Sequence, residues 1–221
     1  MKLAIFDICG TLYFDNTTYS YLRWLSNEGI IKNNKKIMDA PFFLRGLNAL
    51  SSSLFQKDYY RDLQIKQLEG LPRNIIEHSA TEFVEKMDAN RISITNHLLE
   101  DYKSKGYTIV IASATIAPIA NSIANKLGVD YFSSEIEFID NYCTGRMSRD
   151  LLYSKKKILL NLIDAAETTI VVTDNFTDLE LILSSDHCHL VVRGDKDIKR
   201  WEKLLKNNLQ KVEFIKKKID E

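Results

Sequence analysis

The fold of this chain is decided near its N-terminus, by the stretch Leu3-Ala4-Ile5-Phe6-Asp7-Ile8-Cys9-Gly10-Thr11. Its apolar run leads into a glycine, which is typical of a buried strand. Asp7 stands at the carboxyl end of that strand, where open α/β sheets bind ligands. Asp7 and Cys9 should project to the same side because strand side chains alternate, and Gly10 permits a close approach of the backbone to an anion. Taken alone, Asp-x-x-Gly-Thr fits an ordinary turn equally well.

Strands and helices alternate from residue 92 onward. We expect strands at residues 108–112, 131–138, 169–173 and 189–192, and helices at 94–105, 116–127, 156–166 and 179–183. A turn is expected at 141–145. Strands that alternate with helices of this length predict a mainly parallel α/β sheet that includes the N-terminal strand. The apolar stripe over residues 198–212 predicts a last helix packed on the core, and the lysine run at 216–218 predicts a solvated face.

Residues 17–87 have a different pattern. Apolar residues recur at helical spacing near 21–25, 43–50 and 75–84, and no strand pattern is convincing. Because the first strand needs partners from beyond residue 105, this region is an insertion. The predicted domains are therefore an α/β core of residues 1–14 and 92–221 and an all-helical cap of residues 15–91. Four cap arginines could meet substrate or form surface salt bridges: Arg23, Arg45, Arg61 and Arg73.

Composition narrows the class of protein. Hydrophobic residues make up 45% of the 221 residues and charged residues 27%, which excludes disordered and fibrous chains. The formal net charge is zero, which disfavours a nucleic-acid partner. Cys9, Cys143 and Cys188 show neither zinc-ligand spacing nor a disulfide framework, so we expect reduced thiols in a cytoplasmic protein. No stretch approaches the roughly 18 apolar residues of a membrane helix, so no membrane partner is expected.

Two polar segments lie at the ends of predicted strands or helices. Ser113 follows a strand, with Ala114 and Thr115 opening the next helix, where a hydroxyl and free amides could seat a phosphate or simply cap the helix. Three lysines at 155–157 head another helix. Cations there oppose the helix dipole, so their placement indicates a functional site, although solvated surface lysines would also explain at least two of them.

A pair of acids follows the strand near residues 170–172. Asp174 and Asp178 would lie close to Asp7 if the two strands are neighbours. Close carboxylates cannot all stay ionised without a cation, and Mg²⁺ prefers such hard oxygen ligands. An isolated Asp-x-x-x-Asp could equally be a capped loop.

In this order and spacing, these motifs resemble those of the haloacid dehalogenase superfamily, on Asp7–Leu12, Ser113, Lys155 and Asp174–Asp178. The resemblance spans nearly the whole chain and is closest to the phosphoserine-phosphatase-like branch. Residues 143–146, Cys-Thr-Gly-Arg, resemble that branch's Thr-Gly-Arg turn. The resemblance implies a three-layer, Rossmann-like core with an inserted helical cap.

The resemblance also implies a magnesium cofactor and a covalent route. Asp7 would attack phosphorus and form an aspartyl-phosphate. Mg²⁺ would be held by Asp7, Asp174 and the main-chain carbonyl of Cys9, with Asp178 ligating the ion or orienting its shell.

The substrate phosphate would have its own set of contacts. Ser113 would donate to a phosphoryl oxygen, aided by amides near Gly10, Thr11 and Ala114. Lys155 would offset negative charge, and the apolar spacing that follows it selects it over its two lysine neighbours. These parts are what phosphoryl transfer requires, since it depends on positioning and charge stabilisation.

Cys9 is a departure from the family pattern. Family phosphatases usually carry a second aspartate there, which protonates the leaving group and then activates water. A thiol is a poorer acid and base for these steps, and loss of such assistance typically costs about 10²–10⁴-fold. We therefore expect slow turnover.

The substrate class that the resemblance implies is a small phosphorylated metabolite. Alternatives are a non-catalytic binder of phosphorylated ligands that keeps the fold, or a phosphotransferase or phosphonatase variant of it. The sequence leaves the substrate and the oligomeric state open.

Overall fold

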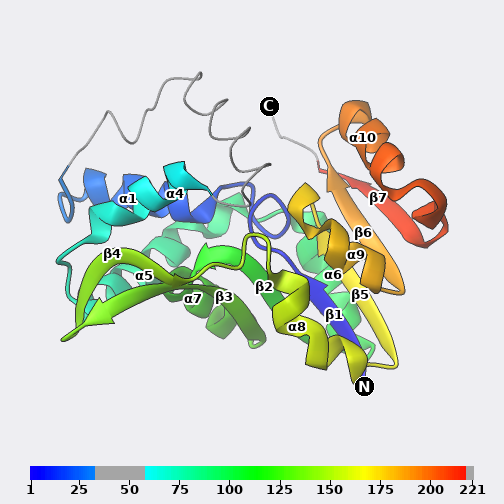
Figure 1. The fold of residues 1–221 in the computed structure, drawn as a ribbon, viewed down its shortest axis with the longest axis horizontal. Coiled ribbons are helices and arrows are strands. Elements are labelled where there is room, and N and C mark those ends of the chain that lie inside the picture. The colour runs from blue at the N-terminus through cyan, green and yellow to red at the C-terminus, as the bar shows by residue number, and fades with distance from the viewer. Residues whose placement is uncertain (33–57, 218–221) are drawn as a thin grey trace.

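The computed structural model describes residues 1–32 and 58–217. Within these residues, the chain forms a seven-stranded sheet in the order β4-β3-β2-β1-β5-β6-β7 (Figure 1). The strands are β1 (Lys2–Phe6), β2 (Thr108–Ile116), β3 (Asp130–Ile139), β4 (Tyr142–Arg149), β5 (Thr168–Thr173), β6 (His187–Val192) and β7 (Val212–Lys216). Neighbouring strands are parallel except β3 and β4. The predicted mainly parallel α/β sheet is confirmed.

β1 lies at the centre of the sheet, between β2 and β5. From β1 the chain winds outward through β2 and β3, and then returns to build β5, β6 and β7 on the opposite side. The end of β1 and the end of β5 therefore flank the point where the winding reverses, which is where open α/β sheets bind ligands.

The sheet has helices on both faces. Along β1, Ala4 and Phe6 join one apolar core and Leu3 and Ile5 join the other, as strand alternation requires. The first core includes residues of α6 (Ser93–Ser104) and α7 (Ala117–Leu127). The second includes residues of α8 (Lys155–Asp164), α9 (Leu179–Ser184) and α10 (Asp195–Leu205). The predicted three-layer arrangement is confirmed.

Between β1 and β2, the described residues form α1 (Thr17–Asn27), α4 (Tyr59–Ile65) and α5 (Arg73–Met87), with 3₁₀ turns at Lys66–Leu68 and Asp88–Asn90. These helices bear out the helical spacing near residues 21–25 and 75–84. The expected helix near 43–50 lies outside the described residues. Apolar residues of α1 and α5 join the same core as α7, so the inserted helices share a continuous apolar core with one face of the α/β part. The domain boundaries at residues 14–15 and 91–92 stay a prediction.

The β3–β4 hairpin corrects the expected turn at 141–145. Asp140 and Asn141 form the turn with left-handed φ angles of 50° and 67°, and Cys143 and Gly145 belong to β4. The Cys143 amide donates to the Leu71 carbonyl at 2.9 Å, and the Gly70 amide donates to the Cys143 carbonyl at 2.8 Å. The segment resembling a Thr-Gly-Arg turn is thus a strand, because its backbone pairs with both β3 and the inserted region.

The predicted helix over residues 198–212 was wrong in its second half. α10 ends at Leu205, a 3₁₀ turn follows at Lys206–Lys211, and β7 then pairs with β6. Lys206 has a left-handed φ of 48°, which cannot continue a right-handed helix. The apolar residues of the stripe are therefore divided between a helix and an edge strand. No helix in the described part of the chain is long and apolar enough to cross a membrane.

Candidate active site

Asp7 and Asp174 follow two neighbouring strands, β1 and β5. The Asp7 amide donates to the Val172 carbonyl at 3.0 Å, which continues the pairing of these strands by one residue. Asp7 is buried, and its Oδ1 accepts the Ile8 amide at 2.8 Å. Both carboxylates therefore reach the ligand-binding edge of the sheet, as the sequence indicated.

Lys155 connects Asp7 with Asp178. Nζ of Lys155 lies 2.7 Å from Oδ2 of Asp178 and 3.2 Å from Oδ2 of Asp7, and all three side chains are buried. Thr173 Oγ1 donates to the same Asp178 oxygen at 2.7 Å. Burial alone would lower the pKa of Lys155, but the charges of Asp178 and Asp7 outweigh burial and raise the pKa above its ordinary value. Lys155 is therefore a fixed cation at the edge of the sheet, whereas Lys157 is exposed.

Asp178 contributes an unsatisfied oxygen. Its Oδ1 is buried and has no hydrogen-bond partner within the described residues. Burial raises the pKa of Asp178, the charge of Lys155 opposes that rise, and the charge of Asp7 adds to it. A buried, unpaired carboxylate oxygen is costly unless a ligand or ion completes it.

The donor chemistry of this edge suits Mg²⁺, which takes carboxylate and carbonyl oxygens. The carboxylates do not already form a cage, however. Across residues 1–32 and 58–217, no group of three or more His, Cys, Asp or Glu side chains is arranged to hold a metal ion. Instead, Asp7 and Asp178 contact Lys155, and Asp174 contacts Lys217.

Lys217 was not predicted as a site residue, because the lysine run at 216–218 indicated a solvated face. Its amide donates to the Val192 carbonyl at 3.0 Å, so the backbone pairing of β7 with β6 extends past Lys216. Strand alternation then turns Lys216 outward, with 63% of its side chain exposed, and Lys217 inward, with 5% exposed. Nζ of Lys217 donates to Oδ2 of Asp174 at 3.0 Å and to the Gly10 carbonyl at 2.7 Å. Lys218 lies outside the described residues.

Gly10 and Thr11 hold the Asp174 loop against the end of β1. Gly10 has a φ of +69°, and a Cβ there would lie 1.9 Å from Oδ2 of Asp174. Thr11 Oγ1 accepts the Asp174 amide at 3.0 Å. The Gly10 and Thr11 amides already donate to the carbonyls of Tyr13 and Ile8. Their predicted role in phosphate binding stays a prediction, and it would require those amides to exchange a partner.

The surroundings of Ser113 and Ala114 differ from the expectation. β2 continues through both residues to Ile116, with an irregular register against β3, and α7 begins only at Ala117. Ser113 Oγ lies 3.1 Å from Thr115 Oγ1 and is buried. Ser113 and Ala114 are therefore strand residues beside the site and not the start of a helix. An irregular stretch of β2 lies where the start of a helix was expected.

Cys9 lies among hydroxyl groups. Its Sγ is 3.2 Å from Thr17 Oγ1 and 3.4 Å from Thr115 Oγ1, and these two hydroxyls are 2.8 Å apart. Burial raises the pKa of the Cys9 thiol, and the charge of Asp7 raises it further. The thiol therefore stays protonated at neutral pH. The sequence carried no signal for Thr17, and it indicated Thr115 only as a residue that opens a helix after Ser113.

Arg61 connects an inserted helix to the core next to the site. Its Nη1 donates to Oδ1 of Asp150 at 2.6 Å, and its Nη2 donates to the Ala114 carbonyl. Only 10% of its side chain is exposed, so it is neither a surface salt bridge nor open to solvent. Arg23 and Arg73 are exposed, and Arg45 lies outside the described residues.

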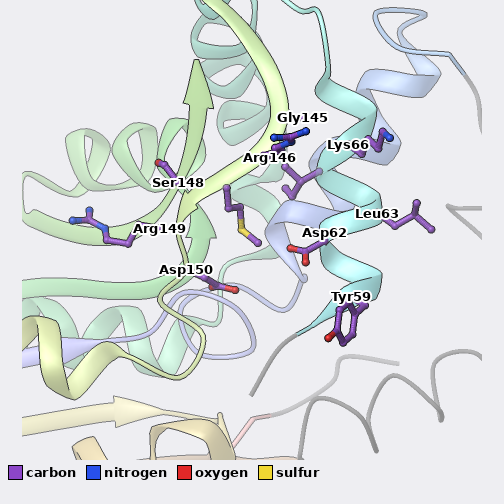
Figure 2. Close-up of a pocket in the computed structure, with 11 residues that line it drawn as sticks. Tyr59, Asp62, Leu63, Lys66, Gly145, Arg146, Ser148, Arg149 and Asp150 are labelled. Carbon is purple, nitrogen blue, oxygen red and sulfur yellow. The ribbon is translucent and has the colours of Figure 1, made fainter. Parts of the chain in front are cut away.

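Two cavities adjoin this region. One of about 980 Å³ opens beside the edge of the sheet, and six of its lining residues are Cys9, Gly10, Asp174, Arg193, Arg200 and Lys217. Another of about 770 Å³ lies between α4 and β4, with Asp62 and Lys66 on one wall and Arg146 and Arg149 on the other (Figure 2). The first is lined by Asp174 and Lys217 of the site and by Cys9 and Gly10 at the end of β1, so it is the candidate substrate cavity.

Solved structures share this fold at low sequence identity. A protein with unknown function from Bordetella pertussis Tohama I aligns with a TM-score of 0.76 at 13% identity, over 97% of each chain. A phospho-aspartyl intermediate analogue of phosphoserine phosphatase aligns at 0.63 and 18%, over 98% of this chain and 93% of that one. A phosphoserine phosphohydrolase-like protein from Francisella tularensis subsp. tularensis SCHU S4 aligns at 0.65 and 17%, over 91% and 92%. The predicted phosphoserine-phosphatase-like fold is therefore confirmed.

No curated protein matches the chain. A family model does match it, over residues 4–182, and its description is haloacid dehalogenase-like hydrolase. The matched range includes Asp7, Ser113, Lys155, Asp174 and Asp178. These are the residues on which the resemblance was based, and four of them also meet at the edge of the sheet. The chain belongs to the haloacid dehalogenase-like hydrolase family.

Proposed function

We propose that the protein is a magnesium-dependent phosphatase-like hydrolase that acts on a small phosphorylated metabolite through an aspartyl-phosphate at Asp7. The observation that carries this proposal is the buried ion pair between Asp7 and Lys155 at the end of β1, 3.2 Å long. A carboxylate held there beside a fixed cation can approach a phosphoryl group without full charge repulsion. The family membership and the phosphatases among the structural relatives support the same reaction class.

Each residue would have a defined task in the first step. Oδ2 of Asp7 attacks phosphorus, the bond from phosphorus to the leaving oxygen breaks, and Lys155 offsets the negative charge that gathers beside it. Asp7, Asp174 and the main-chain carbonyl of Cys9 would hold Mg²⁺, and the unpaired Oδ1 of Asp178 offers a further oxygen. When bound, the ion would neutralise charge on the transferring phosphoryl group.

Cys9 explains why turnover should be slow. The leaving oxygen needs a proton, and water then needs a base to attack the aspartyl-phosphate. Partial burial and the charge of Asp7 raise the pKa of the Cys9 thiol, so it is a poorer proton donor to the leaving oxygen than a carboxylic acid and supplies little thiolate as a base. We expect a loss of about 10²–10⁴-fold relative to a carboxylic acid there, smaller for p-nitrophenyl phosphate because its leaving group needs no proton.

Single-turnover labelling tests the proposal. Incubation with a ³²P-labelled phosphate ester and Mg²⁺ should yield a base-labile acyl-phosphate in the wild type and none in Asp7→Asn. Asp101→Asn, a change at an exposed residue of α6, should label like the wild type and serves as the matched control. Cys9→Asp should hydrolyse alkyl phosphates faster than the wild type. Hydrolysis by Cys9→Asp no faster than wild type would refute the assignment of position 9.

A second function is favoured by the site's own hydrogen bonds. The Cys9 thiol is paired with the hydroxyls of Thr17 and Thr115, which restrains it from protonating a leaving group or activating water. Lys155 and Lys217 still supply positive charge, so the site could bind a phosphorylated ligand without turning it over. Binding of a phosphate analogue such as vanadate, with no labelling of Asp7 in the wild type or in Cys9→Asp, would support this non-catalytic binder over the enzyme.

A further inference from the structure

Lys217 places a second ammonium group at the carboxyl ends of the central strands, beside Asp174. Its Nζ makes two short contacts, 2.7 Å to the Gly10 carbonyl and 3.0 Å to Oδ2 of Asp174. Its side chain is 5% exposed, and its backbone is tied to β6 by the bond to the Val192 carbonyl at 3.0 Å. The side chain is therefore delivered to this point by the edge strand β7 and is held there by oxygen atoms.

The charges at this edge show what Lys217 does. Asp7, Asp174 and Asp178 bring three carboxylates, and Lys155 and Lys217 bring two ammonium groups in direct contact with them. Nζ of Lys155 lies within 3.2 Å of both Asp7 and Asp178. Nζ of Lys217 lies 3.0 Å from Oδ2 of Asp174, so Lys217 supplies the positive charge in contact with the third carboxylate.

One of these two oxygen atoms belongs to the proposed metal site. Mg²⁺ would bind the Asp174 carboxylate and the main-chain carbonyl of Cys9, and Nζ of Lys217 contacts Oδ2 of Asp174 and the carbonyl of Gly10, the residue after Cys9. The Lys217 ammonium already occupies Oδ2 of Asp174. Gly10 lies against the same carboxylate, since a Cβ there would be 1.9 Å from Oδ2 and 2.8 Å from Oδ1, so a metal ion has little room beside the ammonium group.

We propose that Lys217 is a tethered competitor for the cation site, and that divalent metal binds at Asp174 only when the Lys217 ammonium withdraws. This inference rests on the proposed metal site at Asp7 and Asp174. The C-terminal edge strand then sets the affinity for the metal, and the metal-free site keeps its charges balanced with a cation of its own.

The competition predicts the direction of a substitution. Lys217→Met keeps an aliphatic stem of similar length and removes the ammonium group, so the metal no longer has to displace it. A hydrogen bond to a charged group is commonly worth about a tenfold change in an equilibrium constant or more. The apparent dissociation constant of Lys217→Met for Mg²⁺ or Mn²⁺ should therefore be at least about tenfold lower than that of the wild type. Lys216→Met is the matched control, because Lys216 is the neighbouring lysine, is 63% exposed and pairs with Asp195.

Isothermal titration calorimetry of the full chain with MnCl₂ measures these affinities without any turnover. Tighter binding by Lys217→Met with an unchanged Lys216→Met supports the proposal. Equal or weaker binding by a folded Lys217→Met overturns it and leaves the proposed function standing. No divalent binding by the wild type or by either variant overturns both the metal-dependent function and this inference.

A second measurement uses the wild type alone, in case Lys217→Met does not fold. Acetylation of lysine amines with an N-hydroxysuccinimide ester, read by mass spectrometry, reports which side chains are accessible. Saturating Mg²⁺ should raise the labelling of Lys217 several-fold and leave that of Lys216 unchanged. Protection of Lys217 that is the same with and without Mg²⁺, under conditions where calorimetry detects binding, contradicts displacement.

Discussion

Replacing Gly10 by alanine tests how closely the end of β1 and the Asp174 loop are fitted. Gly10 has a φ of +69°, and an alanine there carries the cost of a left-handed backbone, about 1–2 kcal/mol. Its Cβ would also lie 1.9 Å from Oδ2 of Asp174, whereas ordinary contact begins near 3.4 Å. The carboxylate must therefore retreat by about 1.5 Å, which breaks its 3.0 Å contact with Lys217.

The lost contact between Asp174 and Lys217 adds to the backbone cost of the substitution. A hydrogen bond between charged groups contributes about 1.5–3 kcal/mol. Asp174 is 18% exposed, so water recovers part of this. We expect Gly10→Ala to lower the free energy of unfolding by about 2–4.5 kcal/mol in total. Gly106 offers a matched control, since its φ is +78° and no atom lies within 4 Å of its Cβ position, so Gly106→Ala should cost only the backbone part, about 1–2 kcal/mol.

Urea denaturation followed by circular dichroism measures both variants against the wild type, provided that the slopes agree. Making Gly10→Ala and Gly106→Ala in a Lys217→Met background isolates the contact between Asp174 and Lys217. In that background the contact is already absent, so the two changes should lower the free energy of unfolding by nearly the same amount. Equal destabilisation by Gly10→Ala and Gly106→Ala in the wild-type background would show that the Asp174 carboxylate moves aside at no cost and would refute this reasoning.

Substitutions at three further positions test other parts of the site and fold. Lys155→Met leaves two buried carboxylates without their shared cation and should lower the free energy of unfolding by about 3–5 kcal/mol in urea; a loss below 1 kcal/mol would contradict a buried ion pair. Arg61→Ala should cost about 1–3 kcal/mol by the same assay, and Arg61→Lys should recover only part of that, because one ammonium cannot replace a two-pronged guanidinium. Burial lowers the pKa of His189; the charge of Glu213 raises it in part, and that of His187 lowers it further. The folded state therefore binds the proton less readily than the unfolded state. The wild type should therefore lose stability as the pH falls through about 6.5, by at most about 1.4 kcal/mol per pH unit, and His189→Gln should show a flatter profile between pH 8 and 5.5.

The sequence predicted the strands that are covered on both faces of the sheet, because burial on both faces makes a strand a continuous apolar run. β1, β2, β5 and β6 lie inside the sheet and read as short apolar runs, and each was expected within a few residues of its observed position. The acids at the ends of β1 and β5 could be located for the same reason, because a charge directly after a buried run marks the end of a strand. The places of Asp7 and Asp174 therefore followed from local patterns, whereas their assignment to one site together with Asp178 depended on the order of all the motifs.

Elements that depend on a distant partner were not predictable in this way. β7 is an edge strand whose Val212 and Ile215 also fit a helical stripe, and only its pairing with β6 decides between the two. The extension of β2 through Ser113 similarly depends on β3, since the irregular register between them takes up residues that could equally open a helix. Short-range pattern carries no information on either partner.

The error at β7 had a direct consequence for the site. With residues 198–212 taken as one helix, the following lysines had no alternation to follow and were assigned to solvent. A strand there turns successive side chains to opposite faces, so one of two adjacent lysines must point inward. Buried lysines are rare unless they are paired. Had the edge strand been recognised, an inward lysine would have called for a buried acid beside it. Asp174, the carboxylate after β5, is that acid.

The site can be understood as a balance between cations that the chain supplies and one that it recruits. Three carboxylates at one edge of a sheet repel one another, and Lys155 and Lys217 leave a single uncompensated negative charge among these five groups. A divalent ion added to all five would reverse that charge to positive, whereas an ion that replaces the Lys217 ammonium would bring the group to neutrality. Electrostatics therefore favours exchange over addition. The two-residue geometry of β7, with one lysine outward and the next inward, is what makes such an exchange available to this chain.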